Sequence, residues 1–231
     1  MSKSIFITGT GTDVGKTYVT GLLVKKLKDA GLNPAYYKAA MSGNDRDEKG
    51  ELIPGDAKFV KDISGIDQPL HTMCPYIYET AVSPHLASRI EGNPVKLSVV
   101  KDGYNKIINS YDYVAMEGSG GILCPIDFDN ERLYLVDLIR EFNLSTVMIA
   151  DAGLGTINSV VLTYEYMKSH DISCKGIIYN HYHKENVMED DNIFMCEQLT
   201  GLETLARVSD EANELDIDID KLVSLFEEGR S

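Results

Sequence analysis

Short apolar runs alternate with longer amphipathic stretches along the chain. Most of the short runs are apolar throughout, which is typical of strands that are buried on both faces of a sheet. The predicted strands are residues 4–8, 35–39, 112–116, 146–150, 176–180 and 203–206. The predicted helices are residues 15–30, 96–108, 134–142, 157–170, 186–199 and 220–228, with another that begins at Gly55. This alternation predicts an α/β fold, a mostly parallel sheet with helices on both faces.

The 231 residues contain no internal repeat, low-complexity tract or linker. That length suits one large α/β domain with a sizeable core. We therefore expect a single domain over residues 1–231.

The turn between the first strand and the first helix reads Gly-Thr-Gly-Thr-Asp-Val-Gly-Lys-Thr over residues 9–17. Backbone N–H groups at a helix N-terminus favour a phosphate group. Lys16 can reach the β- and γ-phosphates of a nucleotide, and the Thr17 hydroxyl can ligate Mg²⁺. Five residues separate Gly9 from Gly15, one more than the usual pattern. The loop predicts a P-loop NTPase-type domain that binds a nucleotide.

Ligands of parallel sheets bind beyond the carboxyl ends of the strands, so the residues that follow the other strands are candidates. Lys38 ends the second strand, where a lysine can neutralise charge that develops in phosphoryl transfer. Asp56 lies in the first turn of a predicted helix, so it is either a helix-stabilising acid or a metal ligand. Glu117 ends another strand, before a Gly-Ser-Gly-Gly turn at 118–121, and is suited to hold Mg²⁺ opposite Thr17.

Three later segments are less specific. The glycine-rich turn at 151–158 is either a carboxylate site at a helix start or a routine connection. Asn180 ends a strand where guanine-specific GTPases carry Asn-Lys-x-Asp, but here His-Tyr-His follows, which favours adenine with Asn180 as a base contact. The acidic stretch 210–220 is most simply a solvated surface, although one acid there could touch a ligand.

Charge and composition exclude several classes of protein. A net charge of −14 argues against nucleic acid or an anionic membrane as a general partner. No apolar run approaches the roughly 20 residues of a membrane span, and the N-terminus lacks a signal-peptide pattern, so we expect a cytoplasmic protein. The four cysteines are scattered, which predicts neither a disulfide framework nor a zinc site. His181 and His183 are interpreted as loop residues.

The motifs together resemble the dethiobiotin synthetase family over nearly the whole chain. The resemblance rests on Asp13 before Val-Gly-Lys-Thr, on Lys38 followed by Ser-Gly at 42–43, on Ser-Pro-His at 83–85 and on Glu-Gly-x-Gly-Gly at 117–121. The chain departs from the family in having Lys-Ala at 38–39, where Lys-Pro is common. It also lacks a proline at 205–209, which leaves base contacts at Arg207 and Glu214, and the choice among ATP, CTP and GTP, open.

The resemblance implies ATP- and Mg²⁺-dependent carboxylation and ring closure of 7,8-diaminononanoate with CO₂. Dethiobiotin, ADP and phosphate would form through a carbamate and a carbamic-phosphoric mixed anhydride, in the penultimate step of biotin biosynthesis. A site shared across a homodimer is implied as well, with the segment 154–158 of the neighbouring subunit binding the carboxylate of the diamine.

The resemblance also implies a role for each matching residue. The catalytic residues would be Thr12, Lys16 and Lys38. The nucleotide would contact Thr12, Asp13, Val14, Gly15, Lys16, Thr17, Asp56, Glu117, Gly118, Ser119, Gly120 and Asn180. Mg²⁺ would be held by Thr17, Asp56 and Glu117. The diamine would contact Ser42, Gly120, Gly155, Thr156 and Asn158.

Two other functions compete with this hypothesis. Switch ATPases of the ParA or MinD kind carry a second, signature lysine early in the phosphate loop. The equivalent residue here is Gly11, which argues against this function. Amidoligases of the cobyrinic-acid kind share the loop style but normally carry an additional glutaminase domain, for which 231 residues leave no room.

Overall fold

The computed structural model describes residues 2–228. A sheet with the strand order β10-β9-β8-β1-β5-β2 forms its centre, and all neighbours along this path are parallel. These strands are β1 (Lys3–Gly9), β2 (Pro34–Lys38), β5 (Tyr113–Glu117), β8 (Thr146–Asp151), β9 (Cys174–Asn180) and β10 (Thr204–Arg207). The predicted mostly parallel sheet is confirmed, and each of these strands lies within two residues of its predicted bounds.

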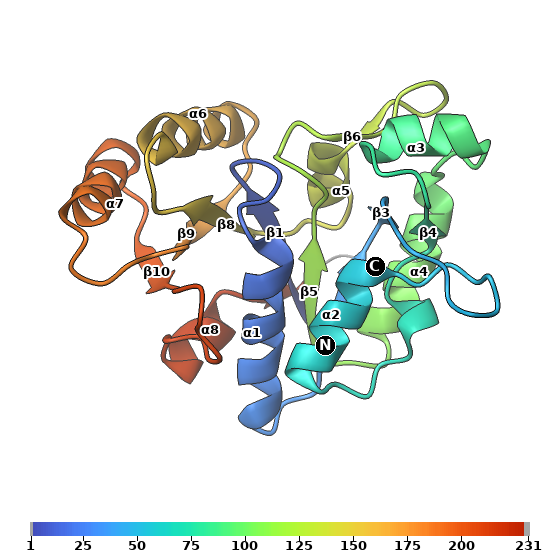
Figure 1. Cartoon of the computed structure of the whole chain (residues 1–231), viewed down its shortest axis with the longest axis horizontal. Coiled ribbons are helices and arrows are strands. Elements are labelled where there is room, and N and C mark those ends of the chain that lie inside the picture. The colour runs from blue at the N-terminus through green and yellow to red at the C-terminus, as the bar shows by residue number, and fades with distance from the viewer. Residues whose placement is uncertain (1, 229–231) are drawn as a thin grey trace.

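Helices cover both faces of the sheet, as predicted (Figure 1). One face packs on α1 (Lys16–Asp29), α2 (Gly55–Ser64) and α8 (Ile219–Ser224). The other packs on α4 (Leu97–Ile108), α5 (Leu135–Glu141), α6 (Thr156–Ser169) and α7 (Val187–Thr200).

Strand β1 shows why its sequence is apolar without alternation. Its side chains point to opposite faces in turn, so Ile5 and Ile7 enter the core beneath α1 while Phe6 enters the core on the other side. All three are fully buried. A strand buried on both faces has no solvent-facing position at which a polar residue would be favoured.

Several short elements were not predicted. They are the 3₁₀ helix η1 (Leu70–Thr72), α3 (Pro84–Glu91), the pair β3 (Ala40–Met41) and β4 (Tyr76–Ile77), and the pair β6 (Pro125–Asp127) and β7 (Leu133–Tyr134). Strands of two or three residues are too short to show a periodic pattern. Of these elements, β3, β4, α3 and β6 lie near one another in Figure 1.

The prediction of a terminal helix over 220–228 is wrong in its second half. The helix α8 ends at Ser224, and β11 (Glu227–Glu228) pairs antiparallel with Lys3 and Ser4 of β1. Strand β8 pairs with β1 only from Phe6 onward, so the first residues of β1 have an open edge on that side. Pairing with β11 satisfies backbone groups that would otherwise lack partners.

Among residues 2–228, no helix has both the length and the apolar character needed to cross a membrane.

Candidate active site

The phosphate loop connects β1 to α1 and ends in a left-handed residue. Gly15, the N-cap of α1, has φ of 82°, a conformation that glycine adopts without steric cost. Lys16 follows it, and its Nζ donates a hydrogen bond of 2.7 Å to the carbonyl of Gly11. No side chain caps the N-terminus of α1, so its first N–H groups are available to an anion.

A cleft of about 1080 Å³ lies along the carboxyl ends of the strands, beside this loop. Most of the predicted site residues line it: Thr12, Asp13, Gly15, Lys16, Thr17, Lys38, Ser42, Asp56, Glu117, Ser119, Gly120 and Asn180. They come from segments far apart in the sequence, and the parallel sheet gathers them because its strand ends share one edge.

An ion-pair network lies at the centre of the cleft. Lys38 Nζ is 2.6 Å from Asp56 Oδ2 and 2.7 Å from Glu117 Oε1. The Thr17 hydroxyl donates a hydrogen bond of 2.8 Å to the same Glu117 oxygen, and Tyr36 donates one of 3.2 Å to the other. Lys38 and Glu117 are 5% and 1% exposed, so this pair is shielded from water, whereas the Asp56 side chain is 41% exposed.

The network determines the charge of its members. Burial lowers the pKa of Lys38, but Glu117 and Asp56 more than offset this and hold that pKa well above its usual value. Burial raises the pKa of Asp56, but Lys38 outweighs it and brings that pKa below its ordinary value. Burial, followed by repulsion from Lys38, lowers the pKa of Lys16. Lys38 is therefore a cation at neutral pH.

The predicted magnesium ligands converge in this network. Thr17 from α1, Asp56 from α2 and Glu117 from β5 all contact Lys38 or one another. A hydroxyl and two carboxylates are hard oxygen donors of the kind that Mg²⁺ prefers, with nucleotide phosphates completing such sites. Within residues 2–228, no cluster of three or more histidine, cysteine or acidic side chains could hold a metal ion.

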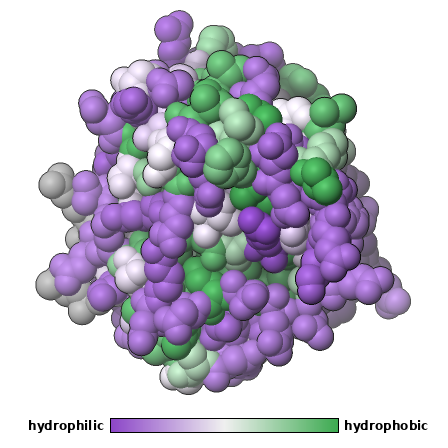
Figure 2. Space-filling view, turned by 90° about the vertical axis from the view of Figure 1, so that its left-hand side faces the viewer, coloured by the Kyte–Doolittle hydropathy of each residue, from purple (hydrophilic) through white to green (hydrophobic). Residues whose placement is uncertain are grey.

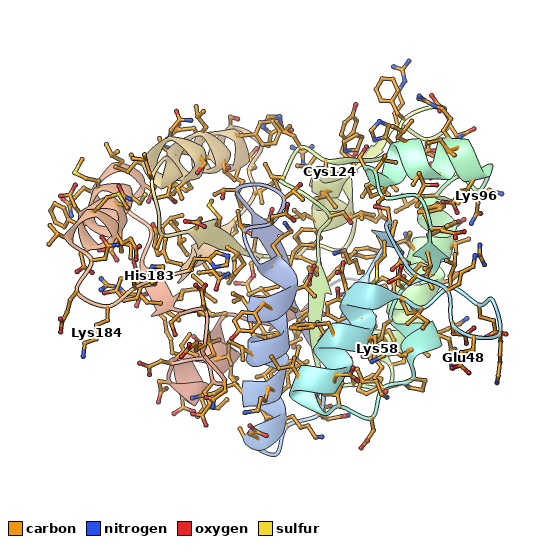
Figure 3. The ribbon with its side chains drawn as sticks, in the orientation of Figure 1. Glu48, Lys58, Lys96, Cys124, His183 and Lys184 are labelled. Carbon is orange, nitrogen blue, oxygen red and sulfur yellow. The ribbon has the colours of Figure 1, made fainter. Side chains whose placement is uncertain are left out.

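The two ends of the cleft differ in chemistry. At one end, Asn180 Nδ2 donates to the carbonyl of Val14, while the buried Asn180 Oδ1 has no partner among residues 2–228. His181 and Asp210 lie beside it and are hydrogen-bonded to each other. At the other end, Ser42 and Cys124 line the wall. Figure 3 shows Cys124 on one side of the phosphate loop and His183, two residues after His181, on the other side.

Five predicted site residues do not line the cleft. Val14 packs against the core on the α1 face, and Gly118 lies against Phe6 and Leu135. Gly155, Thr156 and Asn158 are at the start of α6, away from the cleft of their own chain. Thr156 Oγ1 is buried there, and no group of the described chain pairs with it.

The structure adds residues for which no role was predicted, including Tyr18, Ser83, Cys124 and His181. Ser83 belongs to the Ser-Pro-His motif, which was the one available signal. Asp210 is the acid of the 210–220 stretch that reaches the cleft. Arg207, a doubtful base contact, instead pairs with Asp190 at 3.0 Å and lies over the Tyr182 ring.

Acid should weaken this network at Asp56. A lowered pKa means that Asp56 stabilises the fold above its unfolded-state pKa, and that this contribution is lost as the pH falls through its folded-state pKa. We expect the melting temperature to decrease as the pH is lowered below about 4. Asp56→Asn should remove part of this pH dependence. Asp62→Asn, an exposed acid on the same helix, is the matched control and should keep the wild-type curve. An Asp56→Asn curve parallel to wild type across the acid range would refute the assignment.

Known proteins with similar sequences cover almost the entire chain. A family model described as an AAA domain (AAA_26) matches residues 3–214. The ATP-dependent dethiobiotin synthetase BioD of Brachyspira hyodysenteriae is 47% identical, with 98% of this chain and 100% of the relative covered. The proteins of the same name from Clostridium novyi and Clostridium botulinum (strain Langeland) are 45% and 43% identical, covering 94% and 99% of this chain and 92% and 100% of their own.

Solved structures support the fold alone. The cell division protein MinD of Aquifex aeolicus aligns with a TM-score of 0.53 at 14% identity, covering 97% of this chain and 85% of that one. A chain of the MinC:MinD cell division protein complex of the same organism aligns with a TM-score of 0.56, also at 14% identity, covering 96% of this chain and 85% of that one. Sequence identity over the full length, rather than this distant likeness, decides the family. The chain belongs to the ATP-dependent dethiobiotin synthetase family.

Proposed function

We propose that this protein, acting as one domain, converts 7,8-diaminononanoate, CO₂ and ATP into dethiobiotin, ADP and phosphate, as a ligase of biotin biosynthesis. The observation that carries the proposal is Lys38, a buried cation held by Asp56 and Glu117 beside the Thr17 hydroxyl. A cation there can neutralise the charge of a phosphoryl group and a carbamate together. A site that only binds a nucleotide does not need such a cation. The test is phosphate release that depends on the diamine.

The proposed role of each residue follows from its position in the cleft. Lys16 and the N–H groups of α1 would bind the phosphates, and Asn180 Oδ1 would accept a hydrogen bond from an exocyclic amine of the base. Lys38 would neutralise charge on the transferred phosphoryl group and the carbamate, with Thr12 beside them. Mg²⁺ held by Thr17, Asp56 and Glu117 would supply charge neutralisation at the phosphates. Positioning and electrostatic stabilisation are enough for catalysis, because phosphoryl transfer requires little covalent chemistry from the protein.

The substrate carboxylate would be bound by a second copy of the chain. Gly155, Thr156 and Asn158 lie outside their own cleft but present the uncapped N-terminus of α6, which favours an anion. The exposed apolar residues Leu154 and Leu162, 91% and 62% exposed, lie beside them. Figure 2 shows the face that carries α6 and α7, where hydrophobic residues gather mainly in the upper part among hydrophilic ones.

Asn158→Ala should raise the KM for the diamine by about 10-fold and leave the KM for ATP unchanged, since a hydrogen bond to a charged group is lost. An equal rise of both constants, or no change in the KM for the diamine, would contradict the carboxylate site.

Mixing two impaired variants tests whether the sites are shared. A heterodimer of Lys38→Ala and Asn158→Ala would contain one intact site, built from the unmodified residue of each chain, and one doubly impaired site. Random exchange of equal amounts should restore about a quarter of wild-type activity at low diamine. Activity that stays at the mean of the two variants would mean that each chain binds the carboxylate alone.

A further inference from the structure

The wall of the cleft opposite the base end is the segment between β4 and α3. Ser83 of this segment and Pro84, the first residue of α3, line the cleft. The segment is tied to the loop after β3, because Ser42 donates its hydroxyl proton to the carbonyl of Val82 and the Gly43 N–H donates to that of Thr80 at 3.2 Å. Ser42, a predicted diamine contact, and Ser83 therefore lie on the same side of the cleft.

Ser83 is the N-cap of α3, but its side chain does not cap the helix. A serine at this position ordinarily accepts a hydrogen bond from a backbone N–H of the first turn, which stabilises the helix. Here its Oγ lies 3.0 Å from Nδ1 of His85 instead. The hydroxyl thus connects the cleft to an imidazole behind its wall.

The proposed reaction must dispose of protons at this end of the cleft. An alkyl amine with a pKa of about 10 is protonated at neutral pH and cannot attack CO₂. Its conversion to a carbamate releases two protons in all, one from the ammonium group and one from the same nitrogen once the C–N bond has formed.

The charged groups near Ser42 and Ser83 are poor acceptors for those protons. Lys38 is a cation, and Lys16 donates to a carbonyl of its own loop. Asp56 and Glu117 are held by Lys38. The imidazole of His181 also lines the cleft, but it lies at the base end, hydrogen-bonded to Asp210. Burial raises the pKa of the Cys124 thiol, so it does not readily become a thiolate base.

We propose that Ser83 and His85 form a proton relay that deprotonates the diamine for CO₂ capture, an inference that rests on the function proposed above. The ammonium donates a proton to Ser83 Oγ while the Ser83 hydroxyl proton passes to His85 Nδ1. The freed nitrogen lone pair forms the C–N bond, and a C=O electron pair of CO₂ moves onto oxygen. The second nitrogen proton follows the same route after His85 has released the first to solvent. The relay requires neutral His85 protonated on Nε2.

The charges around His85 suit a group that takes up and releases protons. Arg89, one turn further along α3, forms a bidentate pair with Asp129 on the turn after β6, with Nη2 and Oδ1 2.7 Å apart. Asp127 of β6 accepts the N–H groups of Asn130 and Glu131. The neighbouring charges are thus paired or satisfied, and imidazole is the side chain that exchanges protons most readily near neutral pH.

The test is the pH dependence of kcat/KM for the diamine in His85→Gln, with Ser83→Ala as the second variant and His71→Gln, on η1, as the control. Glutamine can keep a hydrogen bond to Ser83 but cannot carry the proton. We expect a loss of about 100-fold near pH 7 that shrinks toward pH 10, where the amine loses its proton unaided. The KM for ATP should not change, and His71→Gln should match wild type.

A loss that is the same at every pH, or no loss in either variant, would overturn the relay. If His85→Gln does not fold, the profile of Ser83→Ala decides. Wild-type enzyme without diamine-dependent phosphate release would instead refute the proposed function, so the two failures are told apart in one assay.

Discussion

Lys38→Ala is expected to lower kcat for dethiobiotin formation by about 1000-fold, because the variant lacks the cation that meets the charge of the transition state. The KM for ATP should stay within about 3-fold of wild type, since Lys16 and the phosphate loop still bind the phosphates. Single-turnover phosphate release and the KM for ATP, measured together, separate the two effects.

Removing Lys38 also leaves Glu117 buried beside Thr17 and Tyr36 without its counter-charge. Breaking a buried pair in this way costs about 3–5 kcal/mol, so the melting temperature must be followed alongside activity. Lys58→Ala is the matched control: Lys58 lies on α2 and pairs with Asp62 on the surface, away from the cleft. It should retain wild-type turnover. Wild-type turnover by a folded Lys38→Ala enzyme would contradict the role of this lysine.

Gly15→Ala is expected to abolish measurable ATP binding, a loss of at least about 100-fold. A Cβ at residue 15 would lie 2.0 Å from Asn180 Nδ2, so the phosphate loop and the base-end asparagine could not both keep their places. The residue also needs φ of 82°, which an L-residue adopts at a cost of about 1–2 kcal/mol.

Gly31→Ala separates the clash from the backbone strain. Gly31 follows the other end of α1, has φ of 78°, and a Cβ there would meet nothing within 4 Å. Both variants should therefore lose a similar amount of stability from strain, while only Gly15→Ala loses nucleotide binding by calorimetric titration. Equal ATP affinity in the two variants would show that the contact with Asn180 does not matter.

The predicted parts of the site are those with a local signature at a strand end. Lys38 and Glu117 each end a strand, and the parallel order of β1, β5 and β2 brings them to Thr17. Asp56 had only the weak signal of an acid in a first helical turn, and its contact with Lys38 depends on how α2 packs. Tertiary structure, which no local pattern encodes, joins these residues.

The parts that were not predicted depend on short elements and single residues. The wall at 81–84 is positioned by β3, β4 and α3, of which the strands have two residues each. Cys124 and His181 are isolated loop residues of ordinary type, so nothing in their neighbours marks them before the chain folds. The C-terminal strand β11 was read as helix, because the open edge of β1 that it covers exists only in the folded sheet.

The central claim is tested most directly by assaying the purified wild-type protein with Mg²⁺, ATP, bicarbonate and 7,8-diaminononanoate, following phosphate and dethiobiotin together. The account predicts phosphate release that requires the diamine and matches dethiobiotin in amount, with ATP preferred when CTP and GTP are tested in parallel. Phosphate release that ignores the diamine, or that proceeds without the cyclic urea product, would contradict it.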